Sequence, residues 1–279
     1  MKNSRRQFVK QSTRGFAAIS LASVLPLQGL AVNRKVWASE KVNFGVIGCK
    51  GMGWSDMRSH LLMDDVECIA LCDVDQSVLD ERAGQVTEAR GKKPQTYGDY
   101  RKLLDNKDID AVIIGTPDHW HCRIMVDALE AGKHVYVEKP IANSIEECNI
   151  MLAAARKHGK VVQVGQWQRS GDHYQKAYAY LKTGVLGNIR LVKTWAYQGW
   201  MNPVPMIPDS APPAGVDYKM WLGPAPDRPF NKNRFHFNFR WFWDYAGGLM
   251  TDWGCTKSIL HSIIWVLWRP NPLWPQEVN

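Results

Sequence analysis

The sequence predicts an α/β fold built around a parallel, doubly wound sheet in residues 41–166. Short apolar runs alternate there with helical stretches, and the connections between them are short. A glycine-rich turn follows the first run and leads into a helix. At 279 residues the chain is long enough for two domains of ordinary size, and its composition is that of a globular protein.

Five apolar runs are predicted to form strands, at 42–47, 66–72, 111–114, 134–137 and 161–164. The run at 111–114 is apolar throughout, as expected for a strand that helices cover on both faces. The run at 111–114 is counted as the fourth strand of the sheet. A third strand is therefore expected between it and the run at 66–72, but the sequence does not show its position. Helices are expected from near Trp54, from Gln76, and around Ile124 to Leu129. A further helix is bounded at both ends, because Ser144 with Glu147 forms a capping box and Gly159 is a typical C-terminal stop.

The character of the chain changes after Gln166. A helix is expected over about 172–183, then a strand over 189–197, then a stretch rich in proline and aromatic residues that runs to about Tyr245. Nine of the thirteen tryptophans follow residue 194. Exposed aromatic faces can stack on sugar rings, but aromatic side chains also fill cores. The core interpretation is favoured for any single tryptophan.

Residues 1–38 are predicted to be a removable twin-arginine export signal. Arg5 and Arg6 lie in the pattern SRRQFVK, and a 17-residue apolar stretch from Phe16 to Val32 follows. A membrane span needs roughly 20 apolar residues, so the stretch is better interpreted as part of a signal peptide. The segment VWA then supplies a cleavage site before Ser39. A basic amphipathic helix is the alternative. The protein is thus expected to be periplasmic or otherwise exported, and to meet the membrane only during export.

The net charge of +8 does not indicate a nucleic-acid partner. Residues 1–38 hold seven Lys and Arg and no acid, which leaves 28 basic against 27 acidic residues in the remainder. Nucleic-acid binding needs basic charge clustered on the folded domain, so this class of partner is excluded. The six cysteines show no CxxC pair and no zinc spacing, which predicts neither a disulfide framework nor a metal site.

The segment 48–53, with the sequence GCKGMG, is the candidate phosphate loop of a Rossmann-type domain. The usual G-x-G-x-x-G pattern has glycine where this chain has a lysine. The match alone is weak, but a strand precedes it and a helix follows, whose N-terminus offers N–H groups and a positive dipole to phosphate. The residues predicted to bind the cofactor here are Gly48, Lys50, Gly51, Met52 and Gly53.

Asp73 ends the second strand, 20 residues after Gly53. A carboxylate at this place accepts hydrogen bonds from the adenosine ribose and repels the 2′-phosphate of NADP. NAD is therefore the expected cofactor, and NADP is less expected. Capping of a turn is the alternative role for Asp73.

Two loops that follow the fourth and fifth strands are expected to meet near the nicotinamide, because open α/β sheets bind ligands at the carboxyl ends of their strands. The first is GTPDHWH and the second is EKP, which contains Lys139. Burial and a cationic nicotinamide disfavour the charge on a lysine at this place. Lys139 therefore suits a base that takes a hydroxyl proton while hydride leaves the carbon, a role that supplies about 10²–10⁴ in rate. A lysine on a surface turn is the alternative.

The runs GVIGCKGMG, CDVD, DAVIIGTPDHWH and ALEAGKHVYVEKP together resemble the glucose–fructose oxidoreductase / inositol dehydrogenase (Gfo/Idh/MocA) family, from about Lys41 to Gly254. The combination of TPxxxH with AGKHVxxEKP is highly specific. The resemblance implies that Lys139 is the catalytic acid/base. The residues that it implies at the cofactor are Thr116, Pro117, His121 and Glu138.

The second half of the family implies a substrate domain with an open, largely antiparallel sheet, here incomplete within residues 167–279. Its D-x-x-x-H element places a catalytic aspartate at Asp252, but Thr256 stands where the histidine is expected. Substrate contacts are expected from Arg169, Arg240 and Trp241, and a homo-oligomer is expected for a full-length form. Because the resemblance ends near Gly254, residues 256–279 are predicted to be a truncated or frameshifted tail.

Taken together, these features predict an exported NAD-dependent oxidoreductase that acts on a hydroxyl of a sugar, cyclitol or glycoside. One alternative is a glycoside hydrolase that oxidises the sugar transiently and produces no net NADH. The other is a non-catalytic dinucleotide- or sugar-binding protein, because the C-terminal half is incomplete.

Overall fold

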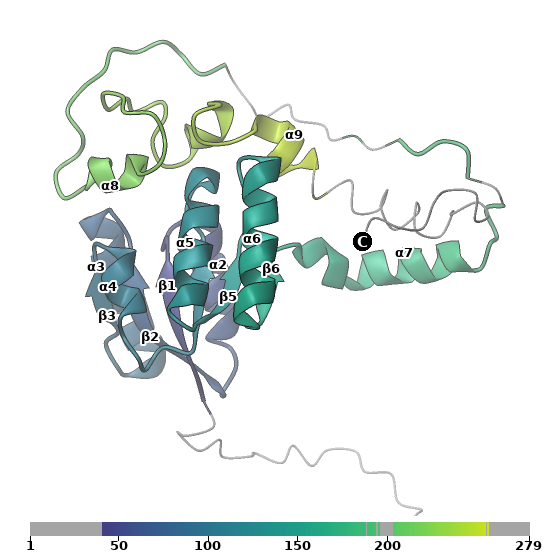
Figure 1. Ribbon diagram of the computed structural model, residues 1–279, viewed down its shortest axis with the longest axis horizontal. Coiled ribbons are helices and arrows are strands. Elements are labelled where there is room, and N and C mark those ends of the chain that lie inside the picture. The colour runs from purple at the N-terminus through teal and green to yellow at the C-terminus, as the bar shows by residue number, and fades with distance from the viewer. Residues whose placement is uncertain (1–40, 188, 194, 196–202, 255, 257–279) are drawn as a thin grey trace, which may run out of the picture. The chain divides into compact units, whose positions relative to one another are not determined.

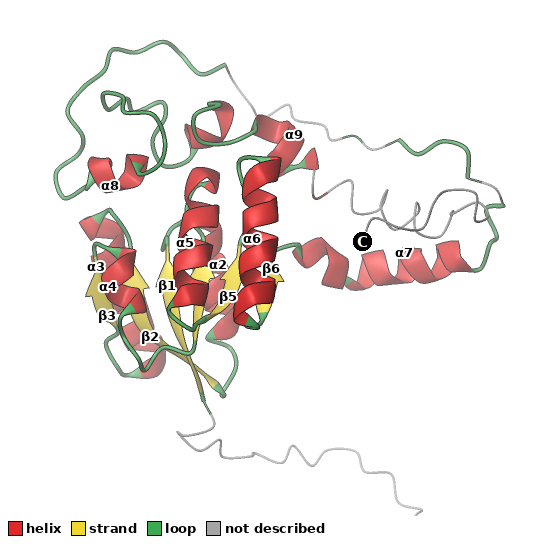
Figure 2. Cartoon of the chain, in the orientation of Figure 1, coloured by secondary structure: helices red, strands yellow, loops and turns green. Residues whose placement is uncertain are grey.

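The computed structural model describes residues 41–187, 189–193, 195, 203–254 and 256 (Figure 1). The predicted leader and the tail from residue 257 lie outside the described residues. A six-stranded, wholly parallel sheet has the order β3-β2-β1-β4-β5-β6 (Figure 2). Its strands are β1 (Val42–Ile47), β2 (Val66–Cys72), β3 (Gln95–Tyr97), β4 (Ala111–Ile114), β5 (His134–Val137) and β6 (Val162–Val164). The predicted α/β fold with a parallel, doubly wound sheet and all five predicted strands are confirmed, with β6 one residue shorter than expected.

The third strand, β3, could not be located from the sequence because it has no apolar run. It contains only Gln95, Thr96 and Tyr97, none of them buried, and it pairs with β2 alone at the edge of the sheet. Edge strands are often short and polar in this way. The sequence of β3 therefore shows neither an alternation of apolar and polar residues nor an apolar run.

Helices cover both faces of the sheet and explain the continuous apolar run of β4. Val112 and Ile114 pack into a core with α4 (Tyr100–Leu104), α5 (Asp118–Glu130) and α6 (Ile145–His158), whereas Ile113 packs into a second core with α2 (Gly51–His60) and α3 (Gln76–Arg90). Successive side chains of a strand point to opposite faces, so a strand between two cores must be apolar at every position.

The ends of α6 follow the predicted signals. Ser144 Oγ accepts a hydrogen bond from Glu147 N at 3.1 Å, and Glu147 Oε2 accepts one from Ser144 N at 3.2 Å. Gly159 ends the helix with φ 59°, a left-handed conformation that glycine adopts without strain. The capping box and the glycine stop are therefore confirmed.

The described residues after Gln166 are helical or irregular. They contain a 3₁₀ turn η3 (Trp167–Ser170), α7 (Asp172–Lys182), α8 (Tyr218–Leu222), a 3₁₀ turn η4 (Asn238–Trp241) and α9 (Gly248–Asp252). A third core joins α8 to η4, and it is largely aromatic: Trp221, Phe230, Phe235, Phe239 and Tyr245 belong to it. The core interpretation therefore holds for Trp221, whereas Trp243 is 85% exposed.

The strand predicted over 189–197 is not found. Residues 189–193 and 195 carry no strand pairing, and 194, 196 and 197 lie outside the described residues. A strand needs a hydrogen-bonded neighbour, and the described residues after 166 supply only one isolated antiparallel bridge, between Val216 and Asp75. The expected antiparallel sheet is thus absent from this part of the chain as described.

The cysteines and the helices bear on two further predictions, disulfide bonding and membrane crossing. Cys49, Cys68, Cys72 and Cys122 are buried free thiols, and Cys148 is a half-buried one. None of the helices within the described ranges combines the length and apolar character that crossing a bilayer requires.

Candidate active site

A cavity of about 410 Å³ opens at the carboxyl ends of the strands. Loops that follow β1, β2, β4 and β5 form one side of it, and α8, η4 and α9 supply residues to the other. The strand order reverses between β1 and β4, and ligands of doubly wound sheets bind at such a point. The cavity is therefore in the place where the fold itself predicts a dinucleotide.

The turn between β1 and α2 is packed backbone against backbone. Gly48 has φ 85°, and a Cβ there would lie 2.7 Å from the carbonyl carbon of Gly115. A Cβ on Gly53 would lie 2.1 Å from the oxygen of Gly48. Gly51, in contrast, begins α2 with open space around it, and no side chain caps that helix. The free N–H groups and the close approach fit a pyrophosphate. Gly48, Lys50, Gly51 and Met52 line the cavity, whereas Gly53 packs against Gly48 and Gly115 and is not on its wall.

Asp73 lies on the cavity wall after β2, and it also braces the phosphate loop. Its Oδ2 accepts a hydrogen bond from Cys49 N at 2.8 Å, and its Oδ1 accepts one from Asp75 N at 3.1 Å. Burial raises the pKa of the Asp73 carboxyl, and these two N–H donors oppose the shift. Both interpretations of Asp73, a cofactor contact and a turn cap, are thus compatible with its position.

His236 joins the cavity wall from the second half of the chain. It has φ 53°, and its Nε2 lies 2.8 Å from Asp75 Oδ2. Burial lowers the pKa of His236, although the Asp75 carboxylate opposes the shift. No motif in the sequence points to this residue, because its partner is 161 positions away.

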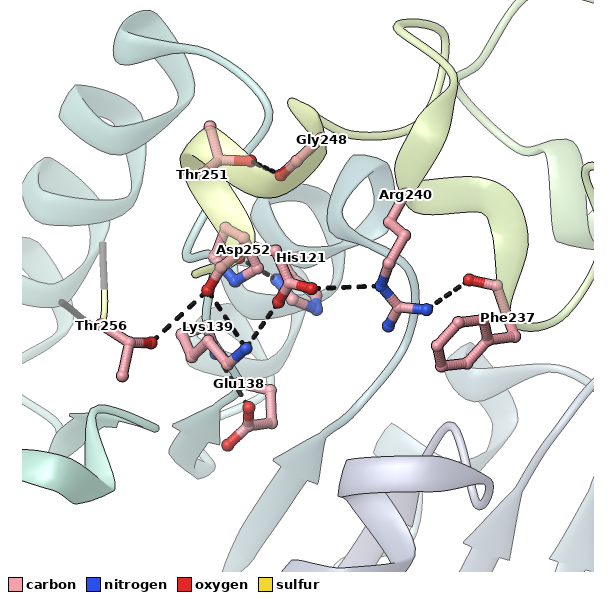
Figure 3. A network of polar contacts seen from close by, with 10 residues as sticks. His121, Glu138, Lys139, Phe237, Arg240, Gly248, Thr251, Asp252 and Thr256 are labelled. Atoms are coloured by element: carbon pink, nitrogen blue, oxygen red, sulfur yellow. Dashed lines mark hydrogen bonds and ion pairs between the residues drawn. The ribbon is translucent and has the colours of Figure 1, made fainter. Parts of the chain in front are cut away.

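Lys139 and Asp252 meet in the cavity although they are 113 residues apart in sequence (Figure 3). Lys139 Nζ donates to Asp252 Oδ1 at 2.5 Å and to the Asp252 carbonyl at 3.3 Å. Arg240 Nε donates to Asp252 Oδ2 at 3.2 Å, and the Arg240 guanidinium lies over the rings of Phe237 and Phe239. Asp252 therefore bridges the two cations, and it holds Lys139 toward the second half of the chain.

Thr256, which stands where the histidine is expected, does not take the place of that residue in the cavity. Its Oγ1 donates to the Asp252 carbonyl at 3.4 Å, a contact within its own turn of chain. It is not among the residues that line the cavity.

Asp118 begins α5 on the wall of the same cavity and is 4% exposed. Burial raises the pKa of its carboxyl to about 7, the Asp252 carboxylate adds to the shift, and the charges of Arg240 and Lys139 oppose it. The sequence motif TPDHWH contains this residue, but nothing in the motif distinguishes it from its neighbours.

Glu138 precedes Lys139 and shares a buried site with Asp56 of α2. Burial and the nearby Asp56 raise the pKa of Glu138 to about 8, and burial raises the pKa of Asp56 to about 6. Asp56 Oδ2 is buried and has no donor unless Glu138 carries a proton. The two side chains therefore hold one proton between them at neutral pH, and Glu138 Oε2 also accepts a hydrogen bond from Lys139 N at 3.2 Å.

His121 fastens the two loops together and does not line the cavity. Its Nδ1 lies 2.7 Å from the Pro140 carbonyl and its Nε2 lies 2.8 Å from the Thr116 carbonyl. Burial lowers the pKa of His121, and the hydrogen bonds to the Pro140 and Thr116 carbonyls oppose that shift. Thr116 and Pro117 themselves are on the cavity wall, as expected.

Two of the three expected substrate residues are not brought to the cavity. Arg169 is exposed on η3, a turn that directs it into solvent. Trp241 lies beside Arg240 on η4 but does not line the cavity, whereas Arg240 does. Besides Asp118 and His236, most of the wall residues that the sequence did not suggest are apolar or aromatic, among them Tyr100, Trp120, Met220, Trp221, Phe237 and Phe239. Among the described residues, no three His, Cys, Asp or Glu side chains gather as a metal site requires.

Comparison with known families assigns both halves of the chain. The model of an oxidoreductase family with an NAD-binding Rossmann fold (GFO_IDH_MocA) matches residues 42–166. The model of the C-terminal alpha/beta domain of that oxidoreductase family matches residues 184–272. The second match extends past Gly254, so the family resemblance continues beyond the end that the sequence motifs predicted.

Individual relatives are similar over part of their length. Glycosyl hydrolase family 109 protein 1 of Shewanella sp. (strain ANA-3) is 30% identical over 201 residues, which are 66% of this chain and 44% of that protein. An alpha-N-acetylgalactosaminidase of Shewanella oneidensis is 37% identical over 154 residues, 54% of this chain and 34% of that protein. The crystal structure of myo-inositol 2-dehydrogenase from Lactobacillus plantarum has a TM-score of 0.49 and 26% identity, covering 53% of this chain and 43% of that one. The chain spans less than half the length of these relatives.

Proposed function

Since the chain belongs to the Gfo/Idh/MocA family of NAD-binding oxidoreductases, we propose that it transfers a hydride between NAD and a hydroxyl-bearing carbon of a sugar, cyclitol or glycoside. The observation that carries the proposal is the position of Lys139. This side chain lies in the cavity beyond the glycine turn, where it is bound to Asp252.

The NAD-binding residues would be those of the turn from Gly48 to Met52 together with Asp73. NAD bound by these residues would supply a hydride acceptor for oxidation of the substrate carbon, and in its reduced form a hydride donor. Lys139 in its neutral form takes the proton of the substrate hydroxyl during oxidation, and the ammonium returns that proton during reduction. Asp252 and Arg240 orient the amine, and the aromatic residues of the third core restrict water at this end of the cavity.

A glycoside hydrolase is the second candidate, and the similarity to glycosyl hydrolase family 109 proteins and to an alpha-N-acetylgalactosaminidase supports it. Oxidation of a ring hydroxyl to a carbonyl acidifies the neighbouring C–H bond, so that a glycosidic oxygen one carbon further on can leave as the aglycone. Water then adds to the resulting double bond, and the same hydride returns to the carbonyl. The cofactor ends in its starting form, so no net NADH is produced.

One assay separates the two candidates. The full-length protein, loaded with NAD, is incubated with free sugars and cyclitols and with a chromogenic α-N-acetylgalactosaminide. NADH absorbance with free sugars supports the dehydrogenase, and release of the chromophore without NADH supports the hydrolase. Lys139→Ala should lower either rate by about 10²–10⁴ while NAD affinity changes little. Lys157→Ala, an exposed lysine on α6, is the matched control. Unchanged turnover in Lys139→Ala would show that Lys139 is not the acid/base of the reaction.

We also propose export by the twin-arginine route, which the SRRQFVK pattern supports. Folded, cofactor-loaded protein crosses by this route, which suits an enzyme that works where free NAD is scarce. The test is fractionation of cells that express the full chain. The parent protein should collect in the periplasm, and the double change of Arg5 and Arg6 to Lys should retain it in the cytoplasm.

A further inference from the structure

Asp118 is a carboxyl on the cavity wall that the mechanism above does not use, and unlike Glu138, the other such carboxyl beside Lys139, it shares no proton with a second acid. Its side chain is almost wholly buried and lies with Lys139, Arg240 and Asp252 around the same space. Within the described ranges, no hydrogen bond from another residue reaches its carboxylate; the contact that affects it is with its own backbone N–H. A nearly buried carboxylate on a cavity wall has lost much of its hydration, so a hydroxyl of a ligand in the cavity can restore a hydrogen bond to it.

The neighbouring carboxylate is already occupied. Both oxygens of Asp252 accept hydrogen bonds, Oδ1 from Lys139 and Oδ2 from Arg240. The family resemblance implies that Asp252 touches the substrate hydroxyls, and in this structure each of its oxygens already accepts from one cation. Asp118 accepts no hydrogen bond from another described residue, so more of its acceptor capacity is open to a substrate that enters beside Lys139.

The charges at this end of the cavity balance. Lys139 and Arg240 are two cations, Asp252 and ionised Asp118 are two anions, and Glu138 beside Lys139 keeps its proton because burial raises its pKa to about 8. A ring with uncharged hydroxyls therefore meets an acceptor and no net charge. A sugar that carries a carboxylate near Asp118 meets a like charge, which costs free energy in a buried site.

We propose that Asp118 binds a hydroxyl of an uncharged sugar next to the one that Lys139 deprotonates, and that it excludes sugars with a carboxylate at that place. The proposal rests on the proposed function, since it takes a sugar to be the occupant of the cavity. It deepens that function by naming the substrate class: neutral polyhydroxy rings with adjacent hydroxyls, not uronates.

The exclusion of anions should depend on pH. The pKa of Asp118 is raised to about 7 by burial and by Asp252 of α9, against the opposing charges of Arg240 from η4 and Lys139 from the loop after β5. Below pH 7 the carboxyl is protonated, the four groups carry a net positive charge, and a uronate is tolerated. Above pH 7 the carboxylate repels it.

The test measures binding, which does not require turnover. NAD-loaded full-length protein is titrated calorimetrically with N-acetylgalactosamine, galactose and myo-inositol as neutral probes and with galacturonate as the anionic probe, at pH 6 and pH 8. The parent should bind at least one neutral probe and bind galacturonate better at pH 6 than at pH 8. Asp118→Asn should bind the neutral probe roughly tenfold to hundredfold more weakly, the range for a hydrogen bond to a charged group. The same variant should bind galacturonate more tightly than the parent does at pH 8, and its affinity should change less between the two pH values than that of the parent.

Opposite shifts for the two kinds of probe separate recognition from damage, because a misfolded cavity would lose both. Asp105→Asn removes the same charge from an exposed position at the end of α4 and should leave all affinities unchanged. Equal changes for neutral and anionic probes in Asp118→Asn, or no binding of any neutral probe by the parent, would overturn the proposal. A parent that binds the neutral probe but transfers no hydride would overturn the proposed function and leave the role of Asp118 intact.

Discussion

The shared proton of Glu138 and Asp56 should make the folded protein less stable as pH rises. The pKa of Glu138 goes from 4.5 to about 8, because burial and the Asp56 carboxyl disfavour its anion. The folded state therefore keeps a proton that the unfolded chain has lost, and its stability falls between these two pKa values. Since Glu138 is only 3% exposed, solvent screens the effect little. The slope is about 1.4 kcal/mol for each pH unit, or about 4 kcal/mol between pH 5 and pH 8.

Glu138→Gln removes the titration but keeps the shape, and its amide can still donate to Asp56. Relative to the parent, the variant should gain about 4 kcal/mol in the free energy of unfolding between pH 5 and pH 8. Urea unfolding at four pH values, followed by tryptophan fluorescence, measures this difference. Glu88→Gln, at an exposed position on α3, controls for the loss of one negative charge. Parallel curves for the parent and Glu138→Gln would refute the shared proton, because a carboxylate that is ionised in both states adds no slope.

Two further predictions concern the dinucleotide. Asp73 should favour NAD over NADP by repelling a 2′-phosphate, so Asp73→Ser should narrow the preference by about tenfold or more in fluorescence titrations; a parent with equal affinity for both cofactors contradicts this assignment. Gly53→Ala should abolish NAD binding, because the new Cβ would lie 2.1 Å from the Gly48 oxygen. Gly84→Ala, in open space on α3, should instead stabilise the protein by about 0.5–1 kcal/mol, and retained NAD binding in Gly53→Ala would show that the turn is not a tight cradle.

The sheet could be predicted from the sequence because its signals are local. The apolar run of β4, the capping box at Ser144 and the stop at Gly159 each depend on neighbours a few residues away. The glycine turn after β1 is local as well, and the order of strands and helices around it follows from the parallel fold. Where the local signal was missing, as in the three residues of β3, the strand could not be placed.

The substrate end of the cavity was less predictable because its contacts are distant in sequence. The family motifs identify Lys139 and Asp252 separately, but the geometry in which Asp252 also accepts from Arg240 is visible only in the fold. The segment after Gln166 illustrates the opposite error. Its apolar residues 189–197 have a strand-like composition, yet the described residues there have no partner strand.

The two halves of the chain contribute different parts of one reaction, and this division constrains the function. The sheet loops carry the glycine turn, Asp73 and Lys139, which suffice for a cofactor and a base. The groups that orient the base, Asp252 and Arg240, come from η4 and α9. Among the residues that the structure describes, Asp252 is the side chain to which Lys139 Nζ donates, so a change in the second half acts on the acid/base group directly. Asp252→Asn should therefore lower turnover through Lys139 while NAD affinity is kept. A loss of NAD binding in that variant, measured by the same fluorescence titration, would show instead that Asp252 supports the cofactor site.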